Sequence, residues 1–130
     1  MLETKSIPKE IKSSIKEKGY ENLTTVQSLV LDPDNNDKDL LVSSQTGSGK
    51  TLAYGLSISV AGLKEILDTD NKLKTLIVTP TRELALQVFN ELAWLFSKTE
   101  IRISTAIGGM DIKKERKRIS KGVDLLIGTP

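Results

Sequence analysis

The sequence predicts an α/β domain with a mainly parallel sheet, on three observations. Short apolar runs typical of buried strands alternate with longer segments of helical spacing. A glycine-rich turn separates the first apolar run from the helical segment that follows it. The chain has 130 residues, of which 38% are hydrophobic, so it suits one domain with a core and is too short for two. Alternating strands and helices form βαβ units, in which helices cover both faces of the sheet.

Two short helices are expected before the first strand. Ile7, Ile11 and Ile15 recur every fourth residue, which predicts an amphipathic helix with Gly19 just after its end. A second helix is predicted to begin near Thr24, because residues 24–27 match the capping-box pattern. Residues 32–37 have the composition of a turn. Residues 1–37 therefore form a helical region, and residues 38–130 form the strand-and-helix core.

Strands and helices alternate through that core. Strands are predicted at residues 40–43, 76–79, 101–107 and 123–127. Helices are predicted from the glycine-rich turn to about residue 66, at 84–95, and at 111–121. This order places the glycine-rich turn between a strand and a helix.

Missing residue types narrow the possible chemistry. The chain has no cysteine, which excludes disulfides and thiolate metal sites, and no histidine, the commonest general base.

No apolar run approaches the roughly 18 residues of a membrane span, and no secretory leader is visible. We expect a cytoplasmic chain with no membrane partner, whose oligomeric state the sequence does not indicate.

The net charge of +2 conceals an asymmetry between the two halves. Residues 1–70 have eight lysines against eleven acids, or −3, whereas residues 71–130 have eleven cations against six acids, or +5. This basic bias permits a polyanionic partner. The basic run at residues 113–118 fits either a nucleic-acid patch or a solvated helix face.

The glycine-rich turn has the residues of a phosphate-binding loop. Its glycines allow positive φ and close approach of backbone N–H groups to phosphate oxygens, and the helix N-terminus adds positive potential. Lys50 would reach the β- and γ-phosphates, and the Thr51 hydroxyl would bind Mg²⁺, so both are candidate catalytic residues. This predicts ATP or GTP binding by the loop Ser44, Gln45, Thr46, Gly47, Ser48, Gly49, Lys50 and Thr51.

Four further runs extend the pattern: Gly19-Tyr20-Glu21-Asn22-Leu23-Thr24-Thr25-Val26-Gln27, Pro80-Thr81-Arg82-Glu83-Leu84-Ala85, Gly108-Gly109 and Gly128-Thr129-Pro130. With the loop, they resemble the Q motif, motif I, motif Ia, glycine doublet and the start of the Thr-Pro-Gly-Arg motif of the DEAD-box RNA helicases. The resemblance runs in order over about the whole chain. It implies an incomplete RecA-like P-loop domain, with residues 1–37 as the Q-motif region, in an ATP-dependent RNA helicase.

The resemblance also assigns nucleotide-binding residues outside the loop. Gln27 has an amide that can pair with the N6/N7 edge of adenine, although it can equally complete the capping box with Thr24. Tyr20 is included among the nucleotide-binding residues, but the family's isolated upstream aromatic has no counterpart. Leu23 stands where the family usually has proline, and Ser44 where it usually has alanine. ATP and Mg²⁺ are the implied cofactors.

RNA contacts are implied for a second group of residues. Backbone N–H groups, a hydroxyl and a guanidinium at a helix start can hold an RNA phosphate without reading its sequence. Thr81 could instead only cap a helix and Arg82 be solvated, and the doublet could be a simple turn. The implied residues are Pro80, Thr81, Arg82, Gly108, Gly109, Thr129 and Pro130.

The sequence has no Asp-Glu-Ala-Asp run, which in that family lies beyond the Thr-Pro-Gly-Arg motif. Asp124 is placed at the wrong end of the last strand to hold a metal at the phosphates. We therefore expect a fragment or a truncated gene product that does not hydrolyse ATP alone. A non-catalytic nucleotide- or RNA-binding remnant is the alternative, and an unrelated P-loop kinase or GTPase is disfavoured by residues 80–85.

Overall fold

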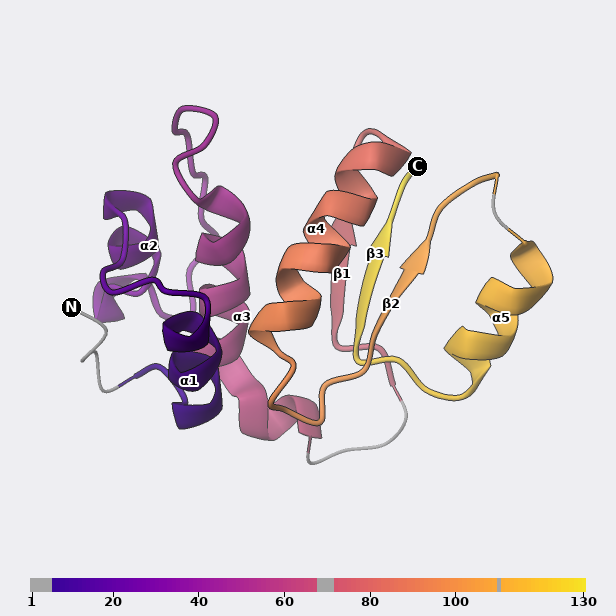
Figure 1. Ribbon diagram of the computed structural model, residues 1–130, viewed down its shortest axis with the longest axis horizontal. Helices are drawn as coiled ribbons and strands as arrows, with labels where there is room; N and C mark the ends of the chain where they lie inside the picture. Colours follow the sequence, from indigo (N-terminus) through magenta and orange to yellow (C-terminus); the bar gives the residue numbers. More distant parts are fainter. Residues whose placement is uncertain (1–5, 68–71, 110) are drawn as a thin grey trace. The chain divides into compact units, whose positions relative to one another are not determined.

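The computed structural model describes residues 6–67, 72–109 and 111–130, and the chain divides into two compact units (Figure 1). The first unit comprises residues 1–63 and 95–99, and the second comprises residues 64–94 and 100–130. From α3 onward, helices and strands alternate in the order α3, β1, α4, β2, α5, β3. No helix in the described ranges is long and apolar enough to cross a bilayer.

The first unit begins with the two predicted short helices. Helix α1 spans Lys9–Glu17 and buries Ile11 and Ile15, and Gly19 follows its end with a φ of 81°. Helix α2 spans Thr25–Val30, and a 3₁₀ turn, η1, spans Pro33–Asn35 within the predicted loop. The capping box predicted at the start of α2 is confirmed, since Thr24 and Gln27 bond to each other's backbone N–H groups.

Helix α3 spans Lys50–Leu67 and starts directly at the glycine-rich loop, as predicted. Leu52, Ala53 and Leu56 are buried at helical spacing, which identifies the face that packs inward. The backbone leaves helical geometry at Gly62, where two helical segments meet in a kink.

The strand predicted at residues 40–43 is wrong. These residues have no regular secondary structure, and Leu41 is fully exposed, with Leu40 and Val42 each 41% exposed. A strand exists only through hydrogen bonds to a neighbouring strand, and the described sheet pairs three other segments. An apolar run predicts burial, but it does not show which other segment, if any, would lie against it and pair with it.

The second unit is built on a fully parallel three-stranded sheet in the order β1-β3-β2. Strand β1 spans Thr75–Val78, β2 spans Ile103–Ala106 and β3 spans Leu125–Gly128, so each differs slightly in its ends from the predicted strand. The central strand β3 buries Leu125 and Ile127, whereas Leu76 and Val78 on edge strand β1 are more than half exposed. The parallel α/β fold predicted from the alternating pattern is confirmed for this unit.

Two helices lie next to this sheet. Helix α4 spans Arg82–Leu95, and its residues Ala85, Val88 and Leu92 are buried at spacings of three and four. Figure 1 shows α4 lying over the sheet and α5, which spans Ile112–Ser120, beside β2. Both helices lie close to where they were predicted.

An ion pair joins the starts of β2 and β3. The Arg102 guanidinium donates to Asp124 at 2.9 and 3.0 Å, and the Arg102 backbone N–H donates to the same carboxylate at 2.8 Å. The side chain of Asp124 is only 4% exposed. These hydrogen bonds from Arg102 lower the pKa of Asp124. Asp124 thus has a structural role at the amino end of β3, away from the strand end that faces a ligand in such sheets.

Candidate functional site

The phosphate loop lies in the first unit and has the backbone geometry that its glycines predict. Gly47 and Gly49 have φ values of 80° and 84°, in the left-handed region that glycine adopts without strain. Position 49 requires glycine for a second reason besides its positive φ. A methyl group there would overlap the side-chain nitrogen of Gln27. The loop runs directly into the first turn of α3, so its N–H groups lie where the helix dipole is positive.

Lys50 lies folded across its own loop. Its Nζ donates to the backbone oxygens of Ser44, at 2.5 Å, and Gln45, at 2.9 Å. The hydroxyls of Ser44 and Ser48 bond to each other at 2.7 Å, which links the two sides of the loop. A phosphate group binding here would replace the two carbonyls as the partner of the ammonium. The Ser44 hydroxyl is what makes this serine–serine bond possible.

The residues of this loop fit a nucleoside triphosphate. Two glycines have positive φ, a conformation that lets successive backbone N–H groups turn toward an anion, and a lysine stands at the first position of the following helix. Thr51 follows in the first turn of α3, where a hydroxyl is suited to hold Mg²⁺. Such a metal would add charge stabilisation for the phosphates to the positive potential of the helix end.

The start of α2 is hydrogen-bonded to the phosphate loop. The Thr24 hydroxyl donates to the backbone oxygen of Ser48 at 2.9 Å, and Gln27 Nε2 donates to that of Gly49 at 3.2 Å. Gln27 Oε1 accepts from the Thr24 backbone N–H at 2.9 Å. The capping interpretation of Gln27 is therefore confirmed, and its contact with adenine stays a prediction. No local sequence pattern predicts the contacts to Ser48 and Gly49, which lie more than twenty residues away along the chain.

A cleft of about 570 Å³ lies between α2 and residues 40–44 and reaches the phosphate loop. Its lining is mostly apolar and includes the loop residues Ser44 and Ser48. The lining residues are Thr24, Thr25, Val26, Leu29, Val30, Asn35, Leu40, Leu41, Val42, Ser43, Ser44 and Ser48. Tyr20 lies after α1 with 51% of its surface exposed, and its role toward a nucleotide stays a prediction.

The residues predicted to bind RNA meet at one edge of the sheet in the second unit. Val78 and Ala106 both pair with Gly128, so the three parallel strands end level with one another. The N–H of Thr79 donates to the Gly128 oxygen at 2.9 Å, and that of Thr129 donates to the Ala106 oxygen at 3.3 Å. The segments 79–82, 107–109 and 128–130 are therefore neighbours at the carboxyl edge, where open α/β sheets bind ligands.

Arg82 lies against the glycine doublet. A methyl group at Gly109 would overlap the guanidinium, and one at Gly108 would lie 3.5 Å from Nη2. Gly109 also has a φ of 82°, so a side chain is disfavoured there for two reasons. The structure thus brings together two motifs that are 26 residues apart in the sequence, with Arg82 exposed beside the glycine doublet.

Thr81 caps helix α4, as one of the two interpretations predicted. Its hydroxyl accepts from the N–H of Leu84 at 3.2 Å, and the Thr79 hydroxyl donates to the Thr81 oxygen at 3.1 Å. Pro80 and Pro130 are exposed and Thr129 is half-buried. Contacts of these residues with RNA stay predictions.

Glu115 is a positioning residue that sequence reasoning missed. It is 8% exposed, and its Oε1 accepts from the N–H of Ile107 at 3.1 Å. This bond attaches α5 to the segment that leads from β2 to the glycine doublet. The only available signal was a single acid within a basic helix, which gives no direction for its side chain.

The fold and the loop define a class of protein: a partial RecA-like α/β domain with a nucleotide-binding phosphate loop. The model of the DEAD/DEAH box helicase family matches residues 24–130. This chain therefore belongs to the DEAD/DEAH box helicase family.

Individual relatives agree with that assignment. The chain is 37% identical over 118 residues to the ATP-dependent RNA helicase CshA of Limosilactobacillus reuteri, covering 90% of this chain and 23% of the relative. It is 35% identical over 137 residues to the mitochondrial ATP-dependent RNA helicase MSS116 of Candida glabrata, covering 100% of this chain and 21% of the relative. The chain thus spans about a quarter of the length of these relatives.

Solved structures show the same fold. The DEAD-box helicase Mss116 bound to ssRNA and UDP-BeF superposes with a TM-score of 0.88 at 29% identity, over 99% of this chain and 27% of that one. A crystal structure of a hypothetical ATP-dependent RNA helicase from Sulfolobus tokodaii gives a TM-score of 0.80 at 32% identity, over 95% of this chain and 34% of that one.

Proposed function

We propose that this chain binds ATP with Mg²⁺ at the phosphate loop and RNA at the carboxyl edge of its sheet, as part of an ATP-dependent RNA helicase. One observation carries the nucleotide part: two left-handed glycines lead into a helix that begins with Lys50 and Thr51. The helicases CshA and MSS116, to which the chain is similar, support the choice of ATP.

The RNA part rests on the edge formed by the ends of three parallel strands. Arg82 supplies a guanidinium beside the doublet of Gly108 and Gly109, where the lack of side chains lets a phosphate approach the backbone. Contacts of this kind position a nucleic acid without reading its sequence. The similarity to Mss116, which was solved with ssRNA, supports RNA as the ligand.

We further propose that these 130 residues bind ATP without hydrolysing it. The residues that directly follow β1, β2 and β3 are Thr79, Ile107 and Thr129, none of which is an acid. Asp124 is at the opposite end of β3 and is paired with Arg102. Hydrolysis requires an acid that holds Mg²⁺ and a positioned water. RNA-stimulated phosphate release above that of Lys50→Ala would contradict this part.

The RNA part is tested by Arg82→Ala. Loss of one phosphate contact should weaken binding of labelled single-stranded RNA by roughly three- to tenfold, equally for all sequences. Fluorescence anisotropy with two RNAs of different sequence measures this, and Lys9→Ala, an exposed charge on α1, is the control for one lost charge. Equal affinities of the parent and Arg82→Ala would contradict the placement of RNA at this edge.

A further inference from the structure

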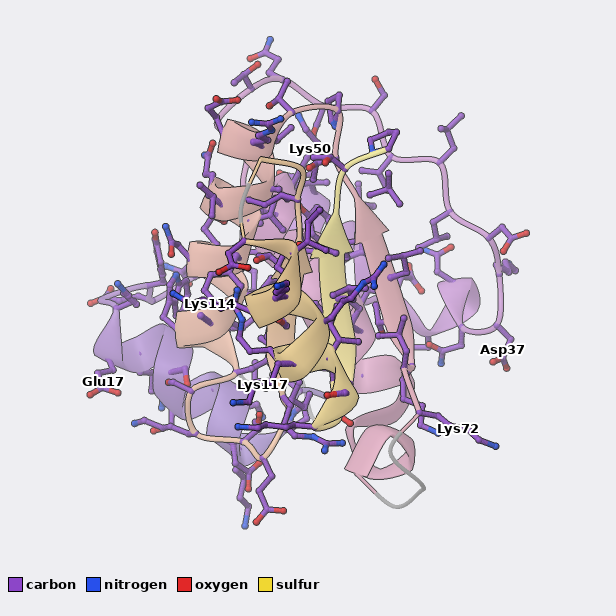
Figure 2. The ribbon with its side chains drawn as sticks, turned by 90° about the vertical axis from the view of Figure 1, so that its right-hand side faces the viewer. Glu17, Asp37, Lys50, Lys72, Lys114 and Lys117 are labelled. Carbon is purple, nitrogen blue, oxygen red and sulfur yellow. The ribbon has the colours of Figure 1, made fainter. Side chains whose placement is uncertain are left out.

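Helix α5 carries a basic face that none of the motifs above uses. It consists of Lys114, Lys117, Arg118 and Lys121, which follow one another at spacings of three, one and three residues and so share one side of the helix. All four are exposed, and together they line a shallow hollow of about 410 Å³. Figure 2 shows Lys114 and Lys117 on the side of α5 that faces the viewer.

The charge of this face is not balanced from within the helix. Residues 111–121 contain six cations and two acids, for a net charge of +4. Asp111 caps the helix by accepting from the N–H groups of Lys113 and Lys114, and Glu115 is buried against the N–H of Ile107. The ion pairs found in the described part of the chain lie elsewhere and leave the four cations of the basic face unpaired.

Helix stability does not account for this arrangement. Cations near the last turn are favoured by the helix dipole, which explains Lys117 and Arg118. Lys114 lies in the first turn, where a cation is disfavoured, and like charges three or four residues apart repel one another. A bound polyanion would remove that repulsion, whereas water only screens it.

The basic face adjoins the proposed RNA edge. Helix α5 begins three residues after Gly109, and Glu115 ties it to the end of β2 through Ile107. Both features belong to the second unit, as does Arg82 beside the doublet. Lys114 and Lys121 are separated by about 10 Å along the helix axis, which is roughly three phosphate spacings of a stacked strand.

We propose that the basic face of α5 binds the phosphate backbone of RNA that extends beyond the edge formed by Thr81, Arg82 and the glycine doublet. This inference rests on the proposed RNA binding and adds a second contact surface to it. Lysine ammonium groups meet phosphates as point charges, so the contact is independent of sequence and sensitive to salt. The surface lengthens the RNA footprint of this domain by several nucleotides.

The test is a triple variant, Lys114→Gln, Lys117→Gln and Lys121→Gln. Glutamine keeps helix propensity close to that of lysine, so α5 should persist, which circular dichroism checks. Anisotropy titrations use a fluorescein-labelled 20-nucleotide single-stranded RNA between 50 and 200 mM salt. The affinity at low salt should fall by about tenfold, and the slope of log K against log salt should shrink by about two, at roughly 0.7 for each lost phosphate contact.

The chain provides a matched control on α1. Lys9, Lys12 and Lys16 have the same spacing as Lys114, Lys117 and Lys121, so their triple change to glutamine removes equal charge from a helix of the first unit. An equal loss of affinity in both triple variants would show a general charge effect and overturn the inference.

Comparison of Arg82→Ala with the α5 variant distinguishes a failure of this inference from a failure of the proposed function. If Arg82→Ala weakens RNA binding and the α5 variant does not, the basic face is not an RNA surface and the proposed function stands. If the α5 variant weakens binding and Arg82→Ala does not, the basic face is supported and the edge is wrong. Binding of poly-L-glutamate through the three lysines, with RNA affinity unchanged, would assign the face to an acidic protein and overturn the inference.

Discussion

At the scale of single residues, Gln27 serves both a short helix and the phosphate loop. Its amide oxygen completes the capping box of α2, and its amide nitrogen holds the carbonyl of Gly49. One donor and one acceptor site on the amide remain for a ligand. Gln27 is only 4% exposed in this structure, and its contact with adenine stays a prediction.

Gln27→Ala should lower the free energy of unfolding by about 1 kcal/mol and narrow the preference for ATP over GTP. Thr24→Ala is the matched control, because it removes the other half of the capping box and no adenine contact. Nucleotide displacement titrations on both variants measure the preference. If both variants lose the same preference, Gln27 acts only by supporting the loop.

Asp124 predicts a dependence of stability on acid pH. Its pKa is lowered in the folded chain, mainly by the hydrogen bonds from Arg102. The folded state therefore binds fewer protons than the unfolded state between the lowered pKa and about 3.9. The contribution of Asp124 is complete above that window and is lost as the pH falls through the lowered pKa.

Asp124→Asn should accordingly lower the urea midpoint at pH 7, and the difference between parent and variant should shrink as the pH falls below about 3.9. Partial exposure of Arg102 limits the size of the effect through solvent screening. A difference between parent and variant that stays constant into acid would show that the carboxylate charge is not what matters.

At the scale of elements, residues 40–43 show that an apolar pattern does not by itself determine whether a segment is buried or forms a strand. The run Leu40, Leu41 and Val42 has the composition of a buried strand, yet it lies exposed beside the cleft next to α2. Exposed apolar segments without a backbone partner promote association between chains. We therefore predict that this run promotes self-association of the chain.

Leu41→Lys should reduce self-association and change the free energy of unfolding by no more than about 0.5 kcal/mol. Leu56→Ala in the same unit is the contrast, since it empties a fully buried position and should cost about 2–5 kcal/mol. Sedimentation velocity and urea unfolding measure the two quantities. A large loss of stability in Leu41→Lys would show that Leu41 is buried in solution.

Elements with local signals could be predicted from the sequence. The capping box at Thr24, the glycine after α1 and the helix at the phosphate loop all depend on residues within one or two turns. Contacts between distant residues could not be predicted in this way. Two such contacts are those of Arg82 with Gly109 and of Glu115 with Ile107. Both depend on the order of the strands in the sheet, which hydrophobic periodicity does not determine.

At the scale of the whole molecule, the two proposed binding sites belong to different compact units. The phosphate loop and the start of α2 belong to the first unit, and the sheet edge and the basic face of α5 belong to the second. Strand-and-helix alternation predicted the parallel sheet and the motif order predicted the family, which the match at residues 24–130 confirms. The chain spans about a quarter of the length of CshA and MSS116.

Calorimetric titration of the chain with ATP and Mg²⁺, compared with Lys50→Ala, tests the central claim most directly. Loss of one charge-assisted phosphate contact is worth roughly 1.5–3 kcal/mol, so affinity should fall about ten- to a hundredfold. Lys9→Ala, which removes an exposed lysine on α1, should bind ATP like the parent. Equal ATP affinity in the parent and Lys50→Ala, with both folded, would contradict nucleotide binding at this loop.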